Sequence, residues 1–124
     1  MPSITIVAGP NEGDYYVVGK RTMVIGRDEA CPVQIVDSRA SRKHVQIRFD
    51  EKAGQYVATD MKSANGTFIN GRSLVSETPL VDGDLIGIGE SRISFSTIEF
   101  PDKKSAVEHY KQRGQRAQST IEQR

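Results

Sequence analysis

The sequence predicts an all-β fold: a two-sheet antiparallel β-sandwich of about 10–11 short strands, followed by a C-terminal tail that is helical or disordered. Short runs rich in Val, Ile, Tyr, Phe and Thr recur up to about Phe100, and turn-forming residues separate them. No long amphipathic helix interrupts this series, whereas residues 101–124 differ in composition. We therefore expect one domain over residues 1–100 and a distinct tail over residues 101–124.

Eight segments carry strand patterns, and the first three are short β-rich runs. They are Ser3–Ala8, Asp14–Val18 and Thr22–Ile25, separated by residues such as Gly9, Pro10 and Asn11. The clearest pattern is His44–Phe49, in which apolar and polar residues alternate. This period of two describes a strand with one buried and one wet face.

The remaining strands follow at close spacing. Residues 50–54 form a turn that should return the chain through Gln55–Thr59 as a hairpin partner. Three more segments complete the series, with Asp-Gly-Asp at 82–84 and Gly-Glu-Ser at 89–91 as turns: Thr67–Ile69, Leu85–Ile88 and Arg92–Ile98.

The tail contains six Lys or Arg against three Asp or Glu. Residues 105–108, Ser-Ala-Val-Glu, have the form of a capping box that starts a helix. A weak stripe at three-to-four spacing would line one side of that helix: Val107, Tyr110, Gly114, Ala117 and Ile121. Glycine costs ~1 kcal/mol inside a helix. A frayed, solvated tail and a helix docked on the sandwich or on a second copy therefore both stay open.

Composition argues against several function classes. A formal net charge of +1 provides no field for non-specific nucleic-acid binding. The single cysteine, Cys31, excludes an internal disulfide and fits a reducing compartment. No apolar stretch approaches the ~20 residues of a membrane span, and the first residues lack the features of a signal peptide. We expect a cytoplasmic protein with neither a nucleic-acid nor a membrane partner.

Three turn regions carry residue types that suit a phosphate ligand. A phosphorylated side chain brings ~−1.5 to −2 charge and three strong acceptor oxygens. Arg27 offers a guanidinium fork that matches phosphate oxygens, and Ser41 and Arg42 offer donors from another loop. The amide of Asn65 or Asn70 can pair with both sides of a peptide unit. These residues indicate a binding module for a phosphorylated peptide.

In order and spacing, these motifs resemble the forkhead-associated domain family, a group of phosphothreonine-binding β-sandwiches. The resemblance covers roughly residues 4–100 and rests on four pieces: Gly26-Arg27, Ser41-Arg42-x-His44, Ser63-x-Asn65-Gly66-Thr67-Phe68-x-Asn70-Gly71 and Val81-Asp82-Gly83-Asp84-x-Ile86-x-Ile88-Gly89. Each piece alone is common, but all four in one order are specific.

The resemblance implies direct ligand contacts. Arg27 and Ser41 would bind the phosphate, and Arg42 would be a second basic contact or a loop support. Asn65 would hold the peptide backbone beside the phosphothreonine, and Asn70 would brace the loop or touch the peptide.

Other positions would support or tune the site. The residues expected to support it structurally are Gly26, His44, Gly66 and Thr67. Arg39 stands where family members often carry a selectivity residue, and would favour an acidic third residue after the phosphothreonine. Ala64 departs from members that place a hydroxyl before the asparagine, so one phosphate contact is missing.

These inferences predict a non-enzymatic, cofactor-free and monomeric module. It would recruit phosphothreonine-containing proteins that an upstream Ser/Thr protein kinase has phosphorylated. Ser41 and His44 lack a third orienting group or an oxyanion motif, and two histidines with one cysteine do not make a zinc site.

One alternative is a structural or scaffold protein whose tail mediates oligomerisation or docking on a larger assembly. In a related switch, phosphorylated residues 119–120 would fold back onto the protein's own pocket.

Overall fold

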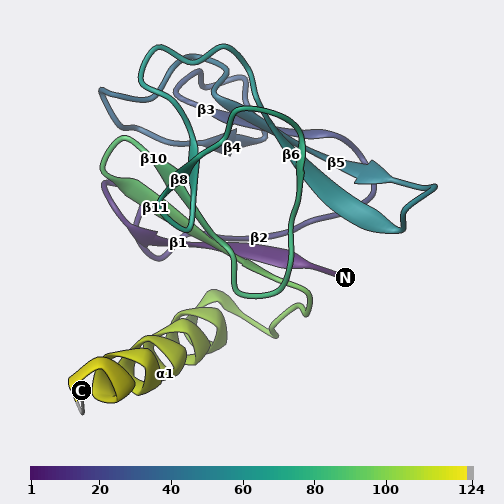
Figure 1. The fold of residues 1–124 in the computed structure, drawn as a ribbon. Helices are drawn as coiled ribbons and strands as arrows, with labels where there is room; N and C mark the ends of the chain where they lie inside the picture. Colours follow the sequence, from purple (N-terminus) through teal and green to yellow (C-terminus); the bar gives the residue numbers. More distant parts are fainter. Residues whose placement is uncertain (123–124) are drawn as a thin grey trace.

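In the described part of the chain, eleven strands form two sheets that pack face to face, and one helix lies along the outside of one sheet (Figure 1). The computed structural model describes residues 1–122, with side chains described through residue 112. The predicted β-sandwich is confirmed, and the tail is helical.

The sheet next to the helix, sheet A, has the strand order β2-β1-β11-β10-β7-β8. Its strands are β1 (Ser3–Ala8), β2 (Tyr15–Val17), β7 (Phe68–Ile69), β8 (Arg72–Ser73), β10 (Leu85–Ile88) and β11 (Ser91–Ser96). Sheet B has the order β4-β3-β5-β6-β9. Its strands are β3 (Met23–Gly26), β4 (Val33–Gln34), β5 (Val45–Asp50), β6 (Gln55–Asp60) and β9 (Thr78–Pro79). Within the described residues every neighbouring pair is antiparallel except β3 and β4, which run parallel.

All eight predicted strands are present, with ends that shift by at most two residues. The three strands that were not individually predicted are β4, β8 and β9, and each is two residues long. Two residues cannot show a period of two, so only pairing with a neighbouring strand reveals such elements.

The core lies between the sheets and is made of the inward-facing residues of both. In β5, Val45 and Ile47 are fully buried while Gln46 and Arg48 are partly exposed, as the alternation predicted. Across the core, Ile86, Ile93 and Phe95 of sheet A are also buried. This packing holds the strand ends in place, and the loops between them carry the predicted site.

The helix α1 (Lys103–Glu122) corrects one local prediction. It begins two residues before Ser105, because the Asp102 carboxylate caps it by accepting the Ser105 backbone N–H at 2.8 Å. The predicted capping box is therefore wrong by one turn. Ala106 is 2% exposed, and α1 lies against β1.

The segment before α1 also packs on sheet A. The Tyr15 hydroxyl accepts the Phe100 backbone N–H at 2.7 Å, and the Phe100 ring lies 5.0 Å from the His109 ring. The predicted stripe members Gly114, Ala117 and Ile121, and residues 119–120, have side chains outside the described part. Among described residues, no helix combines the length and apolar character that a membrane span needs.

Candidate functional site

The end of β3 touches the β4–β5 loop at Gly26. A Cβ atom built on Gly26 would lie 2.1 Å from the Arg42 carbonyl oxygen, so only glycine allows this approach. The next residue is tied to the same loop, since the Arg27 backbone N–H donates to the Ser41 carbonyl at 2.9 Å. The Arg27 Nε donates to the Ala40 carbonyl at 3.0 Å. Arg27 is thus oriented by one side-chain bond, and its two terminal nitrogens form no hydrogen bond with a described residue.

Ser41 joins the β4–β5 loop to the β6–β7 loop. Its Oγ accepts a hydrogen bond from the Ala64 backbone N–H at 3.0 Å. A hydroxyl group can accept and donate at once, and among the residues that the structure describes none accepts the Ser41 hydrogen. Ala64 has no side-chain donor, but its backbone N–H positions Ser41.

His44 is fully buried between the same two loops. Its Nδ1 accepts the Ser41 backbone N–H at 2.9 Å, and its Nε2 lies 2.8 Å from the Gly66 carbonyl oxygen. An amide N–H only donates and a carbonyl only accepts, so Nε2 carries the hydrogen and Nδ1 carries none. Both ring nitrogens are occupied in holding the loops, which leaves neither for proton transfer with Ser41.

Asn65 adds a third link between the β4–β5 loop and the β6–β7 loop. The surface where these two loops meet the β3–β4 loop is called the rim, and its residues are Arg27, Arg39, Ser41, Arg42, Lys43 and Asn65. Its Nδ2 donates to the Arg39 carbonyl at 2.9 Å, and its Oδ1 accepts no bond from the described residues. Gly66 has a φ of +84°, a left-handed turn conformation that favours glycine. The turn presents the exposed Asn65 side chain beside the β4–β5 loop.

The Asp60 carboxylate holds the β6–β7 loop through hydrogen bonds to its residues, a role that was not predicted from the sequence. It accepts hydrogen bonds from the Thr67 hydroxyl at 2.6 Å, the Ser63 hydroxyl at 2.5 Å and the Ser63 backbone N–H at 3.1 Å. Burial by itself would raise the pKa of Asp60, but these hydrogen bonds outweigh it and hold the pKa below its usual value. The only local signal was an Asp three residues before a Ser, a spacing typical of side-chain-stabilised turns.

Asp37 braces the β4–β5 loop in the same way and was also missed. Its carboxylate accepts bonds at 2.9 Å from the Arg39 backbone N–H, the Glu90 backbone N–H and the Ser91 hydroxyl. Burial would raise the pKa of Asp37, yet the three donors hold it below its usual value. Two of these donors lie more than 50 residues away in the sequence, where no local pattern could indicate them.

The rim of the three loops is basic. Arg27, Arg39, Arg42 and Lys43 are all exposed, and the one ion pair among described residues joins Arg48 to Glu77 elsewhere. The Arg42 side chain makes no hydrogen bond to a described residue. Four cations without a carboxylate partner attract a compact anion.

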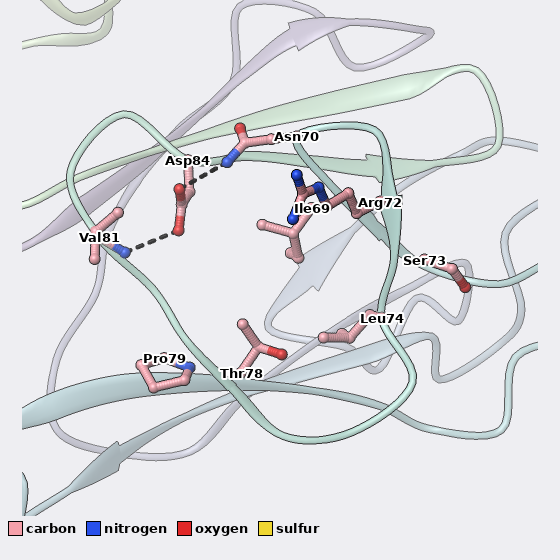
Figure 2. Close-up of a pocket in the computed structure, with 9 residues that line it drawn as sticks. All are labelled: Ile69, Asn70, Arg72, Ser73, Leu74, Thr78, Pro79, Val81 and Asp84. Carbon is pink, nitrogen blue, oxygen red and sulfur yellow. Dashed lines mark hydrogen bonds between the residues drawn. The ribbon is translucent and has the colours of Figure 1, made fainter.

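Asn70 lies outside this arrangement, at the opposite end of β7 from Asn65. Its Nδ2 donates to Asp84 Oδ1 at 2.9 Å, and its Oδ1 accepts the Leu85 backbone N–H at 2.9 Å. Figure 2 shows Asn70 turned towards Asp84, which also accepts the Val81 backbone N–H at 2.8 Å. Of its two expected roles, the structure shows the bracing of a loop.

Comparisons with known proteins identify the family of the chain. The family model for the FHA domain matches residues 23–89. GarA, the glycogen accumulation regulator of Mycolicibacterium smegmatis, is 31% identical over 94 residues, which cover 76% of this chain and 58% of GarA. FhaA of Mycobacterium tuberculosis is 33% identical over 91 residues, which cover 73% of this chain and 17% of FhaA. The chain therefore spans less than two thirds of these relatives.

Two solved structures share the fold. One is the FhaA FHA domain complexed with the intracellular domain of Rv3910, with a TM-score of 0.67 and 29% identity over 77% of this chain and 99% of that one. The other comes from work on phosphothreonine-dependent FHA domain interactions. It has a TM-score of 0.69 and 28% identity over 80% of this chain and 98% of that one.

Proposed function

Because this chain belongs to the FHA domain family, we propose that it is a module that binds peptides phosphorylated on threonine. It recruits proteins that a Ser/Thr protein kinase has modified, and it catalyses no reaction itself. The observation that carries the proposal is the rim at which three loops meet. There Arg27 is bonded to the Ser41 loop, and Ser41 is bonded to the loop of Asn65.

Each rim residue has one role in the proposal. The Arg27 terminal nitrogens and the Ser41 hydroxyl bind the phosphate oxygens, and Arg42 adds a second cation. The free Oδ1 of Asn65 accepts a backbone N–H of the peptide. Arg39 favours an acidic third residue after the phosphothreonine.

The expected affinity is moderate. Each charge-assisted hydrogen bond contributes about 1.5–3 kcal/mol, and ordering of a flexible peptide offsets much of the sum. Three such contacts lead to a dissociation constant that is roughly micromolar, about −8 kcal/mol. This strength suits reversible recruitment in signalling.

The cytoplasmic location is part of this proposal, and we propose a domain that extends past the expected boundary at residue 100. Phe100 and the first turns of α1 pack on sheet A, so we place residues 101–112 with the domain as a structural extension. The Ala106 side of the helix is already buried within the chain. This packing favours an intramolecular role over the scaffold alternative, and we propose a monomer.

Titration calorimetry with one peptide in phosphorylated and plain forms tests the binding function. We expect micromolar binding of the phosphothreonine form only, and weaker binding of its phosphoserine analogue. Arg27→Ala should reduce the affinity roughly 100-fold, because a bidentate phosphate contact of about 3 kcal/mol is removed. Arg21→Ala is the matched control, since Arg21 is exposed and precedes the far end of β3. Equal binding of the phosphorylated and plain peptides would refute the proposal.

A further inference from the structure

A hollow lies beside the rim, on the outer face of sheet A. It has a volume of about 290 Å³ and lies over β10, between β7 and β11. Its lining residues are Phe68, Gly71, Leu85, Gly87, Gly89 and Arg92. We call it the β10 groove. The strand β10 lies two positions away from β1 in the strand order, and α1 packs against β1.

The middle of the groove is one cross-strand row. Gly87 of β10 pairs with Phe68 of β7 on one side and with Arg92 of β11 on the other. A glycine inside a strand weakens it, and commonly marks a bulge, a tight bend or the close approach of a ligand. The register around Gly87 is regular, which excludes a bulge.

Packing does not require this glycine either. A Cβ atom on Gly87 would meet nothing closer than 3.5 Å, an ordinary van der Waals contact, and its φ lies outside the left-handed region. The approach of a ligand is one of the usual reasons for a strand glycine, and neither a bulge nor close packing accounts for Gly87.

Both walls of the groove present unused binding groups. Phe68 is 39% exposed, although it is a large apolar side chain. The Arg92 Nη1 donates to the carbonyls of Gly89 at 2.9 Å and Ser91 at 2.8 Å, which fixes the guanidinium in place. A guanidinium has five N–H donors, so three remain, and Arg92 forms no ion pair with a described residue. The groove thus offers an aromatic surface opposite an oriented cation.

The β10 groove is continuous with the rim. At one end, a Cβ atom on Gly89 would lie 2.8 Å from the Cβ of Arg39, the rim residue proposed to read the third residue after the phosphothreonine. The Phe68 ring also reaches back towards the rim, where it would lie 3.7 Å from a Cβ atom on Gly66. A peptide that passes Arg39 therefore arrives directly at the groove.

We propose that the β10 groove binds the continuation of the same phosphopeptide, the fourth to seventh residues after the phosphothreonine. This inference rests on the proposed function of the rim. From Gly89 to Leu85 the groove follows the three residue steps of β10 and one step into the turn after it, about 13 Å. An extended peptide of about four residues covers this length. An apolar side chain packs on Phe68, and an acidic side chain binds the free donors of Arg92.

Two phosphothreonine peptides test the proposal in fluorescence anisotropy. The core peptide ends at the third residue after the phosphothreonine, with Asp there. The long peptide continues with Leu-Glu-Leu-Glu, and a third peptide continues with Ser-Gly-Ser-Gly. We expect the Leu-Glu extension to raise the affinity about tenfold over the core peptide, and the Ser-Gly extension to leave it unchanged.

Three variants locate the source of this gain. Phe68→Ala and Arg92→Gln should each remove most of it while leaving binding of the core peptide unchanged. Arg72→Gln is the control, because it removes the same charge from the exposed neighbouring strand β8, outside the groove. The gain should persist in this control.

The outcomes separate the two proposals. Binding of the core peptide without any gain from the Leu-Glu extension would overturn the groove and leave the rim intact. The same conclusion follows if the gain survives both groove variants, or if they weaken core and long peptides equally. A core peptide that binds no better than its plain form would end both proposals.

Discussion

Asp60→Asn tests how the β6–β7 loop is held. The carboxylate accepts two hydrogen bonds from Ser63 and one from the Thr67 hydroxyl. An asparagine replaces one of its oxygens by a donor group. Either the Ser63 backbone N–H then faces that donor, or the Ser63 and Thr67 hydroxyls must stop donating and accept instead. Losing one bond to a charged group costs about 1.5–3 kcal/mol, and the remaining bonds weaken to those of a neutral acceptor. We expect the free energy of unfolding to fall by about 2–4 kcal/mol.

Urea denaturation measures this loss, and its pH dependence gives a second check. The pKa of Asp60 is lowered in the folded protein, so between the folded and unfolded pKa values the unfolded chain binds more protons. The carboxylate therefore stabilises the fold above about pH 4, and this contribution is lost as the pH falls through the folded value. The gap in unfolding free energy between wild type and Asp60→Asn should be widest near pH 7 and narrow below pH 4.

Asp50→Asn is the matched control for this experiment. Asp50 also accepts hydrogen bonds in a turn, but from the backbone N–H groups of Lys52 and Ala53 in an exposed hairpin. Its replacement should change the free energy of unfolding by only about 0.5 kcal/mol. Equal unfolding midpoints for Asp60→Asn and wild type would refute the reasoning, as would a gap that does not change with pH.

Three further predictions concern the frame of the site. His44→Ala should lower the free energy of unfolding by about 2–4 kcal/mol and weaken phosphopeptide binding. The reason is that it leaves a cavity and two unpaired backbone groups, the Ser41 N–H and the Gly66 carbonyl. Unchanged stability in urea denaturation would contradict this. Gly26→Ala should destabilise by at least about 1 kcal/mol, since its Cβ would overlap the Arg42 carbonyl oxygen, whereas Gly19→Ala, with only a flexible side chain 3.5 Å away, should be nearly neutral in the same assay. Ending the chain at Phe100 should lower the melting temperature by uncovering sheet A and leave the sedimentation coefficient that of a monomer; a change from oligomer to monomer would favour the scaffold alternative.

Strand patterns were readable in the sequence because burial imposes them. Val45 and Ile47 must face the core, and this requirement leaves an alternation that one strand displays alone. The strands β8 and β9 have two residues each, too few to show an alternation of buried and exposed positions. They form because they pair with neighbouring strands of the sheet. The start of α1 was missed for a related reason. The Asp102 cap that starts the helix is accompanied by the burial of Ala106, which the sequence does not show.

The residues of the site likewise differ in whether the sequence alone could predict them. Arg27, Ser41 and Asn65 were predicted from their residue types and their order in the sequence, and the structure brings their loops together. Asp37 and Asp60 act on those loops from behind, and their partners come largely from folding rather than from spacing. The sequence left two roles open for Asn70, bracing a loop or touching a peptide. In the structure its amide nitrogen donates to Asp84 and its amide oxygen accepts from the Leu85 backbone N–H, which favours the bracing role.

The hydrogen bond from Ala64 to Ser41 has a kinetic consequence. The serine oxygen is already held by a backbone amide before any ligand arrives, so its remaining hydrogen can be donated without breaking a bond. Encounter with a phosphorylated partner would then require little rearrangement of the protein, and association rates should be similar for different partners. Partners would differ mainly in how long they stay bound, which makes the lifetime of each complex the quantity that distinguishes them.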